Sequence, residues 1–277
     1  MKILIIGASS YVGARIYYDL QSKYTVVGTY HNNPLFKSFI PLNATSQEEI
    51  SRILHEVKPD VIVQVANYPS PRNAVNNEKN FIALNHDATK LIVDTANHIG
   101  AKVIFISSQA ANNQTDIYGK LKANSEELVK TVKAGYLILR PSLIVGLSPN
   151  TANDRPFNRI LRCLDDGASN CEFDTSWKLQ PSYIGHLSGV IDGTMKNNGW
   201  NKVIPVFINE IVTQYQIARD ILSEFHVSVG QKDAQLDIPT STNDLTDFRS
   251  FGLKPDSYAT LIQVIVEEIK NRETFRL

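Results

Sequence analysis

The residues best suited by type and spacing to carry out chemistry are Tyr118 and Lys122, which lie four positions apart in a segment with a helical pattern. Residues at this spacing share one face of a helix. An ammonium group beside a phenol favours the phenolate, so the pair predicts a tyrosine of lowered pKa that exchanges a proton near neutral pH. Ser107 and Ser108 precede this helix, where a hydroxyl can bind a carbonyl oxygen that Tyr118 protonates. The alternative is a surface pair, because the spacing alone is a weak signal.

A second chemical feature is the run GASSYVG at residues 7–13, which directly follows the apolar residues Ile3–Ile6. A strand, a tight glycine turn and a helix N-terminus form an anion site, because free N–H groups and the positive helix end point at a phosphate. We expect this run to hold the pyrophosphate of a dinucleotide through Gly7, Ser9, Ser10, Tyr11, Val12 and Gly13. The run lacks a middle glycine, and an ordinary strand–helix turn is the alternative.

The elements that position these residues alternate between strand and helix over the first 140 residues. We expect strands at 3–6, Tyr24–Tyr30, Asp60–Val65, Lys102–Ile106 and Tyr136–Leu139, and helices at Tyr11–Ser22, Gln47–Val57, Glu78–Ile99 and Ile117–Val132. This alternation predicts an α/β fold with a doubly wound parallel sheet of the Rossmann type. Ligands of such sheets bind at the carboxyl ends of the strands, where the glycine run and both serines fall.

The alternation weakens after Arg140. We expect a loop at 148–156, an edge strand at Lys178–Tyr183, a strand at Lys202–Phe207, and helices at Phe157–Leu164, His186–Met195, Thr213–Phe225, Thr240–Phe251 and Asp256–Arg272. Residues 1–146 are therefore expected to form a dinucleotide-binding domain. Residues 147–277 are expected to form a smaller α/β substrate-binding region that partly returns to the sheet.

Composition narrows the class of protein. The 277 residues carry 28 Lys and Arg against 28 Asp and Glu, and a net charge of zero indicates neither a nucleic-acid nor a membrane partner. No apolar run approaches the ~18 residues of a membrane helix, and the chain starts directly with a strand, so we expect a cytoplasmic protein. Cys163 and Cys171 have no His nearby, and two reduced thiols are expected. No metal-binding motif is present, and no metal is expected.

Together these motifs resemble the extended short-chain dehydrogenases/reductases, and within them the dTDP-4-dehydrorhamnose reductase group of sugar-nucleotide reductases. The resemblance rests on GASSYVG (7–13), KPDVIVQVAN (58–67), Asn85 within ALNHDATK, VIFISS (103–108), YGKLK (118–122) and LRPSLIVG (139–146). It implies that Tyr118 is the catalytic proton donor, that Ser108 orients the carbonyl, and that Lys122 holds the cofactor ribose. Beyond Tyr118, Lys122 and the glycine run, it implies cofactor contacts from Tyr30, His31, Ala66, Asn67, Asn85, Ser107 and Pro141.

Cofactor preference depends on the residues that follow the second strand. NAD-dependent proteins often place Asp or Glu there to bind the ribose 2′-hydroxyl. This chain has Tyr30 and His31 followed by two asparagines, and no acid. His31 and Lys37 could face a 2′-phosphate, so we expect NADP rather than NAD, with a solvated His31 as the alternative.

Four positions depart from the family pattern. Ser10 replaces the middle glycine, Ser108 and Tyr118 are only ten positions apart, Gln109 stands in place of an acid, and His186 stands where Asp is frequent. These departures concern the substrate more than the redox chemistry.

The expected function is the NAD(P)-dependent reduction of a small-molecule carbonyl compound by hydride transfer. The expected substrate is a keto sugar or a sugar nucleotide. A sugar-nucleotide epimerase or dehydratase is one alternative. The other is a non-catalytic NADP-binding protein, since relatives such as the regulatory β subunit of methionine adenosyltransferase act by binding a partner. A homodimer is also left open.

Overall fold

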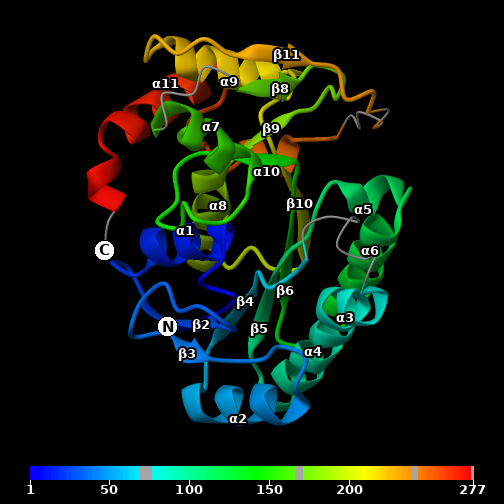
Figure 1. The fold of residues 1–277 in the computed structure, drawn as a ribbon. Coiled ribbons are helices and arrows are strands. Elements are labelled where there is room, and N and C mark those ends of the chain that lie inside the picture. The colour runs from blue at the N-terminus through cyan, green and yellow to red at the C-terminus, as the bar shows by residue number, and fades with distance from the viewer. Residues whose placement is uncertain (69–76, 166–170, 237, 239–242, 276–277) are drawn as a thin grey trace.

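A parallel sheet of seven strands forms the centre of the protein, for which a computed structural model describes residues 1–68, 77–165, 171–236, 238 and 243–275 (Figure 1). The strands lie in the order β10-β6-β5-β4-β1-β2-β3. Their bounds are β1 (Lys2–Ile6), β2 (Thr25–Tyr30), β3 (Ile40–Pro41), β4 (Val61–Gln64), β5 (Lys102–Ile106), β6 (Tyr136–Pro141) and β10 (Lys202–Val206). The expected doubly wound parallel sheet is confirmed.

Helices cover both faces of this sheet (Figure 1). One face packs on α1 (Tyr11–Leu20) and α8 (Ile184–Asn197), and the other on α2 (Gln47–Val57), α4 (Ala88–Ile99) and α6 (Ile117–Val129). Successive side chains of a strand point to opposite faces, so Ile3 and Ile5 join the first core while Leu4 and Ile6 join the second. Burial on both faces explains the unbroken apolar run of β1.

The strand order reverses direction at β1, which pairs with β2 on one side and with β4 on the other. The chain runs outward from β1 through β2 to β3, and then returns to build β4, β5, β6 and β10 on the opposite side. Such a reversal opens a crevice at the carboxyl ends of the two central strands. The glycine turn after β1 lies at this crevice.

Two expected helices differ from the structure. The segment Glu78–Ile99 is divided into α3 (Glu78–Ile82), a π-helical turn at Ala83–Asp87, and α4. The expected helix Thr240–Phe251 is reduced to α10 (Thr246–Arg249), and residues 239–242 lie outside the described residues. The side chain of Asp244 accepts the N–H of Thr246 at 2.9 Å, and this local turn competes with helix before α10.

The rest of the C-terminal half forms a layer of short elements. They are β7 (Leu143–Val145), α7 (Pro156–Asp165), β8 (Glu172–Asp174), β9 (Pro181–Tyr183), α9 (Gln214–Ser223), β11 (Gly230–Lys232), α11 (Tyr258–Lys270) and a 3-10 turn at Arg272–Phe275. Of the expected strand Lys178–Tyr183 only β9 forms, and it pairs with β7 outside the main sheet. None of the helices in the described part of the chain has the length and apolar character that crossing a bilayer requires.

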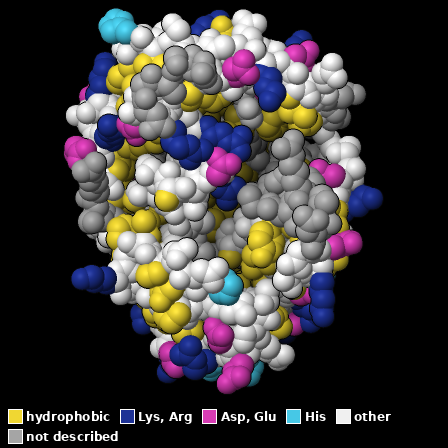
Figure 2. Space-filling view, viewed as in Figure 1, with side chains coloured by type: hydrophobic (Ala, Val, Ile, Leu, Met, Phe, Trp, Pro, Cys, Tyr) yellow, Lys and Arg dark blue, Asp and Glu magenta, His cyan; other side chains and the backbone are white. Residues whose placement is uncertain are grey.

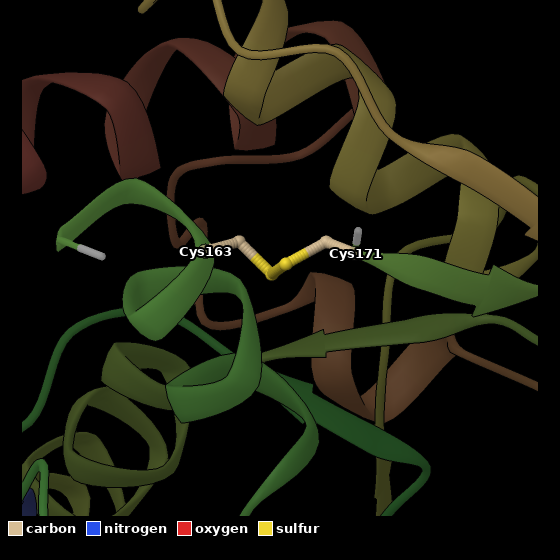
Figure 3. Close-up of a disulfide and its surroundings, with 2 residues drawn as sticks. All are labelled: Cys163 and Cys171. Carbon is tan, nitrogen blue, oxygen red and sulfur yellow. A yellow bond between two sulfur atoms is a disulfide. The ribbon is translucent and has the colours of Figure 1, made fainter. Parts of the chain in front are cut away.

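A disulfide joins Cys163 in α7 to Cys171 immediately before β8 (Figure 3). The expectation of two reduced thiols is therefore wrong for this structure. The last turn of α7 and the start of β8 bring the two Cα atoms to 6.1 Å, which is within the reach of a disulfide. This proximity comes from how α7 and β8 are placed relative to each other, which the spacing of the cysteines does not determine.

Candidate active site

The turn after β1 is packed too tightly for side chains at two positions. Gly7 has a φ of +90°, and a Cβ there would lie 2.8 Å from the backbone nitrogen of Ala66. A Cβ on Gly13 would lie 2.3 Å from the carbonyl oxygen of Gly7. Both positions therefore need glycine. Their small size brings the N-terminus of α1 close to the ends of β1 and β4.

The N-terminus of α1 offers unused hydrogen-bond donors. Ser10 is the N-cap, and its hydroxyl oxygen accepts the N–H of Gly13 at 3.1 Å. No described residue accepts the backbone N–H of Ser9, Tyr11 or Val12. These three donors and the positive end of the helix can together hold a phosphate.

A cavity of about 460 Å³ opens beside this turn. Its walls contain seven of the expected cofactor residues, namely Gly7, Ser9, Ser10, Tyr30, His31, Ala66 and Asn67. Residues 42–45, which follow β3, complete one wall and were not predicted from the sequence, because no motif marks them. The volume and the free N–H groups fit the adenosine and pyrophosphate parts of a dinucleotide.

The side chains of two other expected cofactor residues are used inside the protein. The hydroxyl of Tyr11 donates to the carbonyl oxygen of Gly146 at 2.5 Å, and burial raises its pKa well above the usual value. The hydroxyl of Ser107 donates to the carboxylate of Glu126, which also pairs with Arg140. Both hydroxyls are therefore occupied by hydrogen bonds within the protein.

Asn85 and Pro141 shape loops at the same edge. The side chain of Asn85, in the π-helical turn, accepts the N–H of Tyr68 at 2.7 Å and donates to the carbonyl oxygen of Tyr68 at 3.1 Å. These two hydrogen bonds hold Tyr68, in the segment that follows β4, in place. Pro141 ends β6, and its carbonyl oxygen accepts the N–H of Gln109 at 2.8 Å.

Ser108, Asn67 and Tyr118 come together at the carboxyl edge of the sheet. The Ser108 hydroxyl lies near the Tyr118 hydroxyl and acts to lower the pKa of this phenol, and Nδ2 of Asn67 lies 3.5 Å from the same phenol oxygen. The short connection between Ser108 and α6 folds as α5 (Ala110–Asn113), so close to α6 that a Cβ on Gly119 would lie 2.5 Å from the carbonyl oxygen of Ala110. This packing allows residues only ten positions apart to face each other.

The charge environment of Tyr118 differs from the expectation. Lys122 is buried, its Nζ donates to the carbonyl oxygen of Ile106 at 2.9 Å, and it lies 5.8 Å from the centroid of the Tyr118 ring. Burial raises the pKa of Tyr118 to about 12, so the expectation that Lys122 lowers it is wrong. Burial also lowers the pKa of Lys122 to about 7, against the opposing influence of Glu126. Tyr118 therefore carries its proton at neutral pH.

A charged residue that the sequence analysis missed also influences the electrostatics of this site. The positive charge of Arg155 acts on the hydroxyls of both Tyr118 and Tyr11. Burial lowers the pKa of this arginine. The surrounding sequence indicated only a loop, and no signal in it distinguishes this arginine from a solvated one.

A second cavity, of about 570 Å³, lies between α7, β8, α9 and β11. Its wall includes Leu143 and Val145 of β7, Pro156, and the disulfide between Cys163 and Cys171. Figure 2 shows a hollow in the centre of one face of the molecule, with Lys and Arg side chains gathered above it. The described residues contain no group of three His, Cys, Asp or Glu side chains that could hold a metal ion.

His186, which departs from the family pattern, lies outside the site. Only 1% of its surface is exposed, and its ring packs edge-on against Tyr183 and Phe248. Burial lowers its pKa to about 4. It is a neutral residue of the core beneath the C-terminal layer.

Comparisons with known proteins agree with this architecture. The dTDP-4-dehydrorhamnose reductase of Bacillus anthracis, solved in complex with NADP, has a TM-score of 0.79 and 16% identity, with 98% of each chain covered. The UDP-glucose 4-epimerase of Thermotoga maritima, solved with UDP-glucose, has a TM-score of 0.81 and 17% identity, over 99% of this chain and 100% of the other. At these identities the likeness establishes the fold.

The chain is also similar in sequence to a curated protein that is named as a subunit of another enzyme. Methionine adenosyltransferase 2 subunit beta of Bos taurus is 27% identical over 159 residues, which are 52% of this chain and 47% of the relative. The chain spans about half the length of the curated relatives that it matches. The model of the RmlD substrate binding domain matches residues 1–247, which confirms the resemblance to the reductase group. This chain belongs to the RmlD substrate binding domain family.

Proposed function

We propose that this protein is an NADP-dependent oxidoreductase that moves a hydride between the nicotinamide and the carbonyl carbon of a keto sugar or sugar nucleotide. The observation that carries the proposal is the meeting of Ser108, Asn67 and Tyr118 at the sheet edge where the cofactor-sized cavity opens. The structural neighbours named for a dTDP-sugar reductase and a UDP-sugar epimerase support this substrate class. We assign cofactor binding to residues 1–146 and substrate binding mainly to residues 147–277.

The protein contributes proton transfer and orientation. With a pKa near 12, Tyr118 holds its proton at neutral pH and can give it to the carbonyl oxygen of a substrate. The Ser108 hydroxyl, which lies near the Tyr118 hydroxyl, positions the same oxygen. Lys122 binds the cofactor ribose and, when protonated, stabilises the tyrosinate that remains after the transfer. NADP, when bound in its reduced form, supplies the hydride.

The preference for NADP rests on the end of β2. Tyr30 and His31 line the cavity, and residues 30–33 contain no acid to bind a ribose 2′-hydroxyl. Ser9, Tyr11 and Val12 would hold the pyrophosphate through their free N–H groups.

A phenylalanine at position 118 tests the proposal. General acid catalysis contributes about 10²–10⁴-fold, so Tyr118→Phe should lower turnover by at least ~100-fold while NADPH affinity stays nearly constant. Turnover would be followed by the loss of NADPH fluorescence across a panel of keto-sugar nucleotides and simple ketones. Tyr258→Phe is the matched control, because that hydroxyl bonds Asp220 at 2.8 Å on another side of the fold.

Two results would contradict the proposed catalytic function. Unchanged turnover in Tyr118→Phe would remove Tyr118 from the mechanism. A protein that binds NADPH but oxidises it with no carbonyl of the panel would favour the second candidate, a partner-binding protein, which the similarity to the methionine adenosyltransferase subunit supports.

A further inference from the structure

Two hydrogen bonds fasten α6 to the end of β5 at successive residues. The Nζ atom of Lys122 donates to the carbonyl oxygen of Ile106 at 2.9 Å. The hydroxyl of Ser107 donates to the carboxylate of Glu126 at 2.5 Å. Lys122 and Glu126 are one helical turn apart and share one face of α6. Tyr118 lies one turn before Lys122, so this attachment also fixes the helix turn that carries the proposed proton donor.

Glu126 is the centre of a buried polar network. Only 1% of its surface is exposed. Arg140 on β6 donates from Nε to one carboxylate oxygen at 2.9 Å and from Nη2 to the other, and this two-point pairing compensates the buried negative charge. The Nη1 atom of Arg140 donates to the side-chain oxygen of Asn112 at 2.5 Å, in the short α5 connection. One carboxylate therefore links β5, β6 and α6 directly, and α5 through Arg140.

The Lys122 ammonium depends on the same carboxylate for charge compensation. It is buried 4.5 Å from the centroid of the Phe105 ring and forms no ion pair with any residue in the described part of the chain. Burial lowers its pKa, and the negative charge of Glu126 opposes that effect. The Tyr118 ring lies on its other side, with the centroid at 5.8 Å.

Other titratable side chains on the elements packed against α6 do not act on Lys122. They are His86 and Asp87, which pair at 2.9 Å, Lys90 and Asp94, which pair at 2.6 Å, His98, whose ring lies 5.8 Å from that of His55, Lys102, which lies over the Trp200 ring, and Tyr136 at the amino end of β6. Glu126 is therefore the acid that affects the charge of Lys122.

We propose that Glu126 is a positioning residue that acts on the proposed reaction through Lys122. It fastens their shared face of α6 to the end of β5 and places a negative charge one helical turn from the ammonium. In the proposed mechanism, protonated Lys122 stabilises the tyrosinate that forms when Tyr118 gives up its proton. Without the Glu126 charge, Lys122 should lose its proton at a lower pH and this stabilisation should end there. The inference rests on the proposed function and adds a residue that acts on it indirectly.

The titration of Lys122 tests this role without any substrate. Carbon-13 NMR of protein with labelled lysine side chains follows the ammonium, and the Lys122 signal is identified by its absence in Lys122→Met. We expect the pKa of Lys122, about 7 in the wild-type protein, to fall by about 1 pH unit in Glu126→Gln, because a nearby opposite charge shifts a pKa by about 1–3 units. Glu126→Asp keeps the charge and should recover much of the shift.

Glu127→Gln is the matched control. Glu127 is the next residue of α6, but its side chain is exposed and pairs with Lys130 at the surface, so its removal should leave the pKa of Lys122 unchanged. Thermal melting checks that each variant is folded. If Glu126→Gln does not fold because Arg140 has lost its partner, Glu126→Gln combined with Arg140→Met removes both charges, and a fall in the Lys122 pKa is still expected.

Turnover as a function of pH is the second measurement. Glu126→Gln should move the alkaline limb of the profile to lower pH by about 1 unit, which lowers turnover about 10-fold on that limb. A loss of turnover that is equal at every pH would indicate a purely structural role and overturn the proposal. An unchanged Lys122 pKa in a folded variant without the Glu126 charge would also overturn it.

The proposed function fails by different results. A wild-type protein that does not bind NADPH, measured first by fluorescence titration, contradicts that function and not the link between Glu126 and Lys122. The same holds for a protein that binds NADPH but reduces no carbonyl compound. In both cases the lysine titration decides by itself whether Glu126 controls the charge of Lys122.

Discussion

Two groups of buried charge lie on either side of the glycine turn, and they are compensated very differently. On the α1 side, Arg15 pairs with Asp19 at 2.9 Å and with Glu268 at 2.8 Å, and it donates to the Tyr183 hydroxyl at 3.1 Å. The two carboxylates and Tyr183 raise the pKa of this arginine against the effect of burial. Every charge in this group has an opposite neighbour, and the group connects α1 to α11.

On the α6 side, the buried carboxylate of Glu126 pairs with Arg140, but two cations lack such partners. Lys122 donates to a backbone carbonyl, and Arg155 forms no ion pair with the described residues. Burial lowers the pKa of both groups, and it raises that of Tyr118. From this difference we infer that the complete network serves the fold, and we expect a bound ligand to complete the other one.

The largest expected effect is loss of stability when the complete group is broken. Arg15→Met leaves Glu268 buried without its main partner, and breaking a buried ion pair costs about 3–5 kcal/mol. Urea unfolding should show this loss in the free energy of unfolding. Arg155→Met is the matched arginine variant on the other side, and it should change stability by less than about 1 kcal/mol. Equal losses in the two variants would remove the distinction between the groups.

An intermediate effect is expected in the pH dependence of stability. Lys122 has a pKa of about 7 in the folded protein against 10.5 for the ordinary group, so the unfolded chain binds more protons between these values. The contribution of Lys122 to the free energy of unfolding should therefore rise with pH from 7 to 10, by at most about 1.4 kcal/mol per pH unit. This contribution is measured as the difference in the free energy of unfolding in urea between the wild-type protein and Lys122→Met at each pH across that range.

Lys130→Met provides the control for this pH series. Lys130 caps the C-terminus of the same helix, is exposed, and pairs with Glu127 at the surface. Its unfolding curve should follow that of the wild-type protein at every pH. If Lys122→Met also follows the wild-type curve, Lys122 is not the buried titrating group.

The smallest expected effect concerns cofactor choice on the glycine-turn side. His31→Asp places an acid at the end of β2, which would repel a 2′-phosphate and accept a bond from a 2′-hydroxyl. The ratio of NADPH to NADH affinity, measured by fluorescence titration, should shift toward NADH by roughly 10-fold, the effect of about 1.4 kcal/mol. Equal affinities for the two cofactors in the wild-type protein would argue against the assignment of NADP.

Local patterns of the sequence were enough to predict the parallel sheet, the glycine turn and the shared helix face of Tyr118 and Lys122. Apolar runs, helical spacing and glycines act over a few residues, so they can be read without knowing the fold. Gly13 is an example, since the close contact that requires it is with the carbonyl oxygen of Gly7 in the same turn.

Other properties were decided only by the tertiary structure. The disulfide between Cys163 and Cys171 depends on how α7 and β8 meet, and the pKa values of Tyr118 and Lys122 depend on burial by distant elements. The loop that contains Arg155 is tied to the glycine turn by Asn150, whose side chain binds Ser9 more than 140 residues away in the chain. Burial and contacts between distant segments arise from packing of the whole chain, and the spacing of residues in sequence does not record them.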